Sequence, residues 1–163
     1  MKINARTEIY GLLGYPVHHT FSPVMHNSAF EDLGINAIYL PFEIKSEDLE
    51  SSVECLKSIG VKGLNVTIPH KERVIKYLDS LDREAALIGA VNTIVNIKGK
   101  YKGYNTDGRG FISSIEEEFG IVPKGKKFFI IGAGGAARAV SFSLALRGAC
   151  RIVLVDRVGK KAI

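Results

Sequence analysis

The sequence predicts an α/β fold, with an N-terminal domain built on a mainly parallel sheet and, after it, the opening of a dinucleotide-binding domain. The first observation is that short apolar runs at 9–14, 37–42 and 63–68 alternate with segments whose apolar side chains recur at helical spacing. This β-α-β-α-β order is typical of a parallel sheet with helices on its faces. The second observation is a glycine-rich turn between an apolar strand and a helix, beginning at Gly132.

Length and composition limit the classes of function. The chain has 163 residues, enough for one domain and part of a second, and a net charge of +5 that is spread without a basic run. This distribution argues against a nucleic-acid surface, and no stretch approaches the roughly 20 apolar residues of a membrane span. Cys55 and Cys150 are too isolated to predict disulfides or a zinc site, and no signal peptide is apparent. We therefore expect a cytoplasmic protein with no metal, no nucleic-acid partner and no membrane association.

The first two helices are predicted from the residues that begin and end them. Ser22 suits the N-cap of the first helix and Pro23 its first turn, while Gly34 ends it where a left-handed residue is favoured. Ser46 is the expected cap of the second helix, which ends at Gly60. Capping is therefore the simplest role for Ser22.

The stretch 63–71 combines a strand with a candidate catalytic lysine. Apolar residues at alternate positions from Leu64 onward predict the strand. Pro69 suits the first turn of a helix, where its missing N–H would have no partner in any case, and this places Lys71 in that turn. The partial positive charge of a helix N-terminus disfavours an ammonium, so a lysine there is better suited to donating a proton than to carrying a surface charge. A solvated lysine after a strand is the alternative.

Two short helices, at 74–78 and 83–88, and two strands, at 90–97 and 100–104, are predicted next. Asp107 then lies at the start of a further helix, whose positive end stabilises an ionised carboxylate. Capping that helix is the alternative role for Asp107.

A linker at 120–127 precedes a pattern typical of dinucleotide binding. An apolar strand at 128–131 leads into the glycine turn at 132–137, and a second strand at 152–155 ends at Asp156. In such a unit the first glycine permits a tight turn, the second lets the backbone approach a pyrophosphate, and the helix N-terminus supplies N–H groups for the phosphates. An acidic residue about 20 positions after the turn completes the pattern. A tight turn without a ligand is the alternative.

Five motifs in this order resemble those of the shikimate dehydrogenases, the NADP-linked oxidoreductases of aromatic amino-acid biosynthesis that reduce 3-dehydroshikimate to shikimate. The resemblance covers essentially the whole chain. Its motifs are 11–16 with 20–23, 65–71, 88–93, 105–108 and the glycine turn at 132.

The resemblance implies a role for each candidate residue. Lys71 and Asp107 would form the catalytic pair, in which the lysine stabilises and protonates the oxygen formed by hydride transfer. Short hydroxyl and amide side chains would suit a polyhydroxylated acid, because they reject analogues that leave their hydrogen bonds unmade. The implied carboxylate contacts are Thr20 and Ser22, and the implied hydroxyl contacts are Asn65, Thr67 and Asn92. The implied cofactor contacts are Gly132, Ala133, Gly134, Gly135, Ala136, Asp156 and Arg157.

Three departures from the family pattern bear on function. Thr20 replaces the usual serine and keeps its hydroxyl. At the cofactor end, Arg157 favours NADP, whereas Asp156 is the residue that an NAD site would use on the ribose hydroxyls. The chain also stops at Ile163, after two strands of a cofactor sheet that normally has about six.

We therefore expect a substrate-binding catalytic domain at 1–105, a connecting helix and linker at 106–126, and an incomplete NADP-binding Rossmann domain at 127–163. The expected substrates are shikimate and 3-dehydroshikimate, and this chain alone is expected to be inactive. An NAD-dependent quinate/shikimate dehydrogenase and a non-catalytic sensor of the pathway acid are the alternatives. A homodimer is left open.

Overall fold

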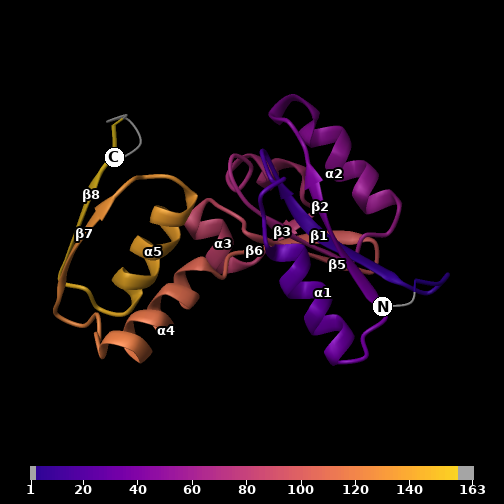
Figure 1. Ribbon diagram of the computed structural model, residues 1–163. Helices are drawn as coiled ribbons and strands as arrows, with labels where there is room; N and C mark the ends of the chain where they lie inside the picture. Colours follow the sequence, from indigo (N-terminus) through magenta and orange to yellow (C-terminus); the bar gives the residue numbers. More distant parts are fainter. Residues whose placement is uncertain (1–2, 158–163) are drawn as a thin grey trace. The chain divides into compact units, whose positions relative to one another are not determined.

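The computed structural model describes residues 3–157 and divides the chain into two compact units (Figure 1). The first unit contains the chain up to residue 82 together with 91–104, and the second contains 83–90 and the chain from residue 105 onward. The domain limits expected at 105 and 126 stay predictions, and residues 158–163 of the expected cofactor domain lie outside the described part.

The first unit is built on a six-stranded sheet whose order is β2-β1-β3-β5-β6-β4. Strands β2, β1 and β3 run parallel, β5 is antiparallel to both of its neighbours, and β4 pairs in parallel with β6. The predicted α/β class and mostly parallel sheet are confirmed. The strands are β1 (Glu8–Gly14), β2 (Ala37–Glu43), β3 (Gly63–Val66), β4 (Ser80–Leu81), β5 (Thr93–Ile97) and β6 (Lys100–Tyr104).

Helices α1 (Ser22–Asp32) and α2 (Leu49–Ser58) lie on opposite sides of this sheet, with α1 below and α2 above the strands in Figure 1. Successive side chains of a strand point to opposite faces, so each face has its own core. Leu12 of β1 packs with Tyr39 and Val17, whereas Leu13, with no exposed surface, points to the other face.

The predicted caps of the first two helices are wrong. Phe21 occupies the N-cap of α1, Ser22 is the first helical residue, and no side chain caps the helix. The Ser22 hydroxyl oxygen instead accepts a hydrogen bond from Thr20. Ser46 begins the 3₁₀ helix η1 (Ser46–Asp48), a common lead-in to an α-helix, and α2 follows it directly.

The predicted helix start at Pro69 is also wrong. Strand β3 ends at Val66, the chain then turns through the cis peptide between Ile68 and Pro69, and the 3₁₀ helix η2 (Arg73–Tyr77) begins only afterwards. Lys71 therefore lies in a turn before a short helix, and the argument from a helix dipole does not apply to it.

In its described residues, 83–90 and 105–157, the second unit contains two parallel strands and three helices, as the sequence predicts. Ile112 and Ile115 of α4 and Leu144 of α5 form its core, against which Phe128 and Ile130 of β7 pack. The alternate side chains of β7 are exposed. The elements are α3 (Arg83–Ile88), α4 (Asp107–Phe119), β7 (Lys127–Ile131), α5 (Gly135–Leu146) and β8 (Arg151–Val155).

Candidate active site

The polar residues expected to bind hydroxyl groups gather at one edge of the first unit's sheet. Asn65 near the carboxyl end of β3 stands opposite Thr93, the first residue of the antiparallel β5. The Val66 N–H donates to the Asn92 carbonyl at 2.8 Å, and the Thr67 N–H donates to a carbonyl of β1 at 2.9 Å. Backbone pairing thus brings the three predicted hydroxyl contacts together.

Gly14, the last residue of β1, has no side chain and so leaves room for Thr67. A Cβ added at Gly14 would lie 2.4 Å from Thr67 Cγ2 and 2.7 Å from Val17 Cγ1, far inside van der Waals contact. Glycine at this position therefore lets the Thr67 side chain lie directly over the strand end.

Lys71 is held in the same region by its backbone and by its neighbour. The Lys71 carbonyl accepts a hydrogen bond from the Val91 N–H at 2.8 Å, next to Asn92. The side chain of His70 is fully buried, with Nε2 2.6 Å from the Ile44 carbonyl oxygen. Because a carbonyl can only accept, Nε2 carries the hydrogen. The turn that contains Lys71 is therefore attached to the segment before β5 on one side and to the segment after β2 on the other.

Thr20 and Ser22 are bonded to each other at the start of α1. The Thr20 hydroxyl donates to Ser22 Oγ at 3.1 Å, and the Ser22 N–H donates to Thr20 Oγ1 at 3.2 Å. Glu43 at the end of β2 holds the loop before them, because its carboxylate accepts the Val17 N–H at 2.8 Å. This bond, with His18 3.4 Å away, keeps the pKa of Glu43 below its usual value, so the loop stays attached at neutral pH.

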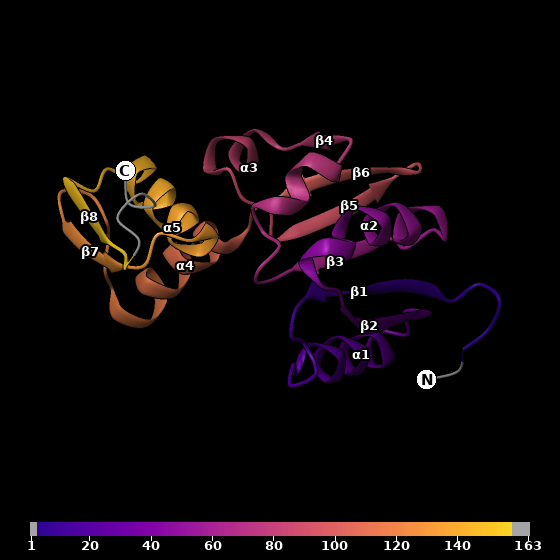
Figure 2. The same cartoon turned by 90° about the horizontal axis from the view of Figure 1, so that it is seen from above.

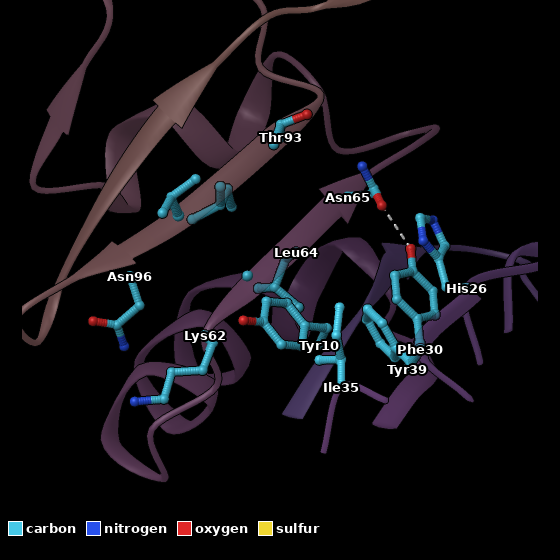
Figure 3. A pocket seen from close by; sticks show the side chains of 13 residues that line it. Tyr10, His26, Phe30, Ile35, Tyr39, Lys62, Leu64, Asn65, Thr93 and Asn96 are labelled. Atoms are coloured by element: carbon cyan, nitrogen blue, oxygen red, sulfur yellow. Dashed lines mark hydrogen bonds between the residues drawn. The ribbon is translucent and has the colours of Figure 1, made fainter. Parts of the chain in front are cut away.

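Asn65 also marks one end of a groove of about 490 Å³ on the α1 side of the sheet (Figure 3). Its lining is mainly apolar and includes Tyr10, Phe30 and Ile35. An apolar groove does not suit a polyhydroxylated acid, so the polar residues at the strand ends, and not the groove, remain the expected substrate contacts.

Asp107 belongs to the second unit. It is the first residue of α4, its N–H donates to Asn105 Oδ1 at 3.0 Å, and buried Asn105 in turn donates to the Ala90 carbonyl at 3.0 Å. Its place at the positive end of a helix is confirmed. Its pairing with Lys71 stays a prediction.

The glycine turn of the second unit has the backbone expected of it. Gly132 has a φ of 113°, which favours glycine, and Gly134 precedes the first turn of α5. The Ala133 N–H donates to Asp156 Oδ2 at 2.9 Å. The carboxylate at the end of β8 therefore fastens the turn, a role that the spacing of the sequence did not indicate.

Residues 3–157 contain neither a cluster of metal-ligating side chains nor a membrane-spanning helix. No group of three His, Cys, Asp or Glu side chains there could hold a metal ion. Nor does any helix in that part of the chain have the length and apolar character needed to cross a bilayer.

Comparison with known proteins identifies relatives along nearly the whole chain. A family model described as the shikimate dehydrogenase substrate binding domain matches residues 12–94. The shikimate dehydrogenase (NADP(+)) of Methanopyrus kandleri is 51% identical over 162 residues, which are 99% of this chain and 56% of the relative. That of Halothermothrix orenii is 55% identical over 156 residues, which are 96% of this chain and 54% of the relative.

A solved structure gives the same result. The shikimate 5-dehydrogenase of Listeria monocytogenes, in complex with shikimate and NAD, is 39% identical, with a TM-score of 0.89 over 100% of this chain and 58% of that one. The chain thus spans a little over half the length of the proteins it matches. Since the family model covers half of the chain and relatives more than 50% identical cover nearly all of it, the chain belongs to the shikimate dehydrogenase family.

Proposed function

We propose that this chain is the substrate domain and the opening of the cofactor domain of a shikimate dehydrogenase, which reversibly reduces 3-dehydroshikimate to shikimate with NADPH. The observation that carries the proposal is the collection of Asn65, Thr67, Asn92 and the Lys71 turn at one sheet edge. The names of the relatives support the same reaction.

The ring acid would be bound by its carboxylate and by its hydroxyls. The bonded pair of Thr20 and Ser22 supplies hydroxyl groups at the N-terminus of the 11-residue α1, where unpaired backbone N–H groups favour an anion. Amide and hydroxyl side chains at the ends of β3 and β5 suit ring hydroxyls, and an analogue without those hydroxyls would leave buried polar groups unpaired.

Lys71 would carry the proton transfer. Bound NADPH supplies the hydride for the ring carbonyl carbon. The electron pair of the carbonyl bond then moves to oxygen, where the Lys71 ammonium stabilises the charge and donates the proton that completes the alcohol. Asp107 is proposed to orient that ammonium.

NADP is the proposed cofactor. Asp156 accepts the Ala133 N–H and so helps to shape the turn, while the adjacent Arg157 can grip the 2′-phosphate of NADP with two hydrogen bonds. The relatives from Methanopyrus and Halothermothrix are NADP(+) enzymes by name, and the Listeria structure holds NAD, which keeps the NAD-dependent alternative open.

The assay that tests this function uses the chain continued into a complete cofactor domain. We expect higher catalytic efficiency with NADP than with NAD, and with shikimate than with quinate. Higher efficiency with NAD or with quinate would favour the quinate/shikimate alternative. Binding of shikimate without turnover would favour the sensor.

Replacing Ser22 by alanine is expected to raise the Michaelis constant for shikimate about tenfold, because a hydrogen bond to a charged group is lost. The Michaelis constant for NADP should change little. Ser28→Ala, at an exposed position of the same helix, is the control. Equal changes for both substrates would show that Ser22 does not contact the acid.

A cytoplasmic location is part of the proposal. It is supported by Cys55 and Cys150, which are both exposed and unpaired, as is usual for thiols in a reducing compartment. A homodimer is proposed on the family resemblance alone.

A further inference from the structure

The side-chain amide of Asn65 receives a hydrogen bond from a buried tyrosine. The Tyr39 hydroxyl donates to Asn65 Oδ1 at 2.8 Å, and this bond is drawn in Figure 3. Tyr39 lies on β2 and Asn65 on β3, two strands that are separated by β1. The tyrosine side chain therefore extends across β1, the strand between them, to make the contact.

Tyr39 has little freedom to move. Tyr39 is only 3% exposed and packs with Leu12. Its ring stacks on that of His26, with a centroid separation of 4.2 Å. The Asn27 side chain bonds both backbone groups of Tyr39: Oδ1 accepts the N–H at 2.8 Å and Nδ2 donates to the carbonyl at 3.0 Å. The hydroxyl is therefore held at a fixed position.

The hydroxyl also stays protonated. Burial raises the pKa of Tyr39 to about 12, because a charged phenolate would have to form away from water. If the Asn65 amide were reversed, its NH₂ would face the tyrosine oxygen and the buried hydroxyl hydrogen would lose its acceptor. An unpaired buried donor is costly, so the amide is held with its oxygen towards Tyr39.

The other end of the amide points away from Tyr39 (Figure 3). Within residues 3–157, the Asn65 NH₂ group has no hydrogen-bond acceptor. Asn65 and Thr67 are two residues apart on an extended backbone, so they share the face of the sheet that α1 covers. The NH₂ group is thus available at the substrate edge as a donor.

We propose that Tyr39 is a positioning residue that fixes Asn65 as a hydrogen-bond donor. This part of the site then binds only a substrate oxygen that can act as a hydrogen-bond acceptor. The inference rests on the proposed function, in which Asn65 contacts a ring hydroxyl. Asn65 touches the substrate, and Tyr39 acts through it.

The oxygen of a second amide at the same edge also accepts a hydrogen bond from a hydroxyl group. The Thr93 hydroxyl donates to Asn92 Oδ1 at 2.9 Å. At Asn92, as at Asn65, a neighbouring hydroxyl thus bonds the amide oxygen and fixes the orientation of the amide. Through Asn65, the site is set to donate a hydrogen bond to a hydroxyl oxygen of the acid.

The first test needs no ligand. Tyr39→Phe keeps the ring and its packing but removes the O–H, so the side-chain ¹⁵N–H₂ resonances of Asn65 in the 163-residue chain should shift. Tyr10→Phe is the matched control, because Tyr10 lines the same groove and donates to Glu8 at 3.1 Å instead. Asn65 resonances that are the same in the Tyr39→Phe and wild-type chains would overturn the proposal.

The second test is a double-mutant cycle on shikimate binding, followed by NMR titration. Tyr39→Phe should weaken binding about fivefold, as expected for the loss of one oriented hydrogen bond, and should have no effect in an Asn65→Ala background. Asn65→Asp, which keeps the acceptor for Tyr39 but lacks NH₂, should bind as weakly as Asn65→Ala. An equal loss from Tyr39→Phe in both backgrounds would overturn the positioning role. Failure of the wild-type chain to bind shikimate, with the Asn65 resonances still shifted in Tyr39→Phe, would count against the proposed function and leave the fixed amide supported.

Discussion

Replacement of Lys71 by alanine is expected to lower the turnover number by about a hundredfold or more, the usual contribution of a general acid. The change removes the ammonium that would protonate the nascent alcohol. It leaves the backbone bond from Val91 to the Lys71 carbonyl in place, so the turn should keep its structure. Because the proton is transferred in the transition state, the Michaelis constant for shikimate should change much less than the turnover number.

The measurement is steady-state kinetics on the chain continued into a complete cofactor domain. Lys76→Ala is the control, because Lys76 is exposed and lies over the Tyr77 ring at 4.6 Å, in the helix that follows the same turn. An unchanged turnover number in Lys71→Ala would remove Lys71 from the mechanism. Asp107→Ala should also lower turnover, and its folding must be checked because Asp107 begins α4.

Replacement of Gly108 by alanine is expected to destabilise the second unit by about 1–3 kcal/mol, the range for overpacking a close contact. A Cβ at Gly108 would lie 2.1 Å from Ser143 Oγ and 2.5 Å from the Ala139 carbonyl oxygen, both on α5. The serine can turn away, but the carbonyl belongs to a helix backbone. Helices α4 and α5 would therefore have to separate, next to the residue proposed to orient Lys71.

Gly110→Ala is the matched control, since it is the same change two residues later in α4. An added Cβ at Gly110 meets nothing within 4 Å, so the variant should gain about 0.5–1 kcal/mol from the lower entropy of the unfolded chain. The measurement is amide hydrogen exchange in α4 and α5, which reports the stability of the second unit in each variant. A local measurement is needed because a chain with two units has no single unfolding free energy. If both substitutions changed the stability of the second unit in the same direction, the expected close contact at Gly108 would be contradicted.

The sequence predicts most of the strands because their patterns are local. Alternating apolar residues from Leu64 predict β3, and apolar runs beside a glycine turn predict β7 and β8, all of which the structure contains. Strand β4 has only two residues, too few for any periodicity to show.

The mistaken predictions share a physical cause, which is that one residue type suits two local structures. Proline fits the first turn of a helix, but Pro69 lies in a tight turn instead. Serine fits an N-cap, yet the Ser22 hydroxyl is bonded to Thr20, two residues earlier. For Ser22, a hydrogen bond with a neighbouring side chain thus takes the place of the expected cap.

The positioning contacts could not be predicted because they join distant parts of the chain. Asn27 and Tyr39 are 12 residues apart, and Tyr39 and Asn65 are 26 apart. In the sequence, Tyr39 is one more aromatic residue in an apolar strand. Likewise, nothing near Asp156 indicates that its carboxylate would bond Ala133.

The two bonds between Asn27 and the backbone of Tyr39 also fix the position of α1 along β2, and with it the distance between the two ends of the proposed site. A slide of α1 by one residue, about 1.5 Å along its axis, would break both of them. Ser22 at one end of α1 and Asn65 beyond Tyr39 are thereby kept at a set separation. The site would then select an acid by the distance between its carboxylate and its ring hydroxyl. A molecule one bond longer or shorter could make hydrogen bonds at only one end of the site.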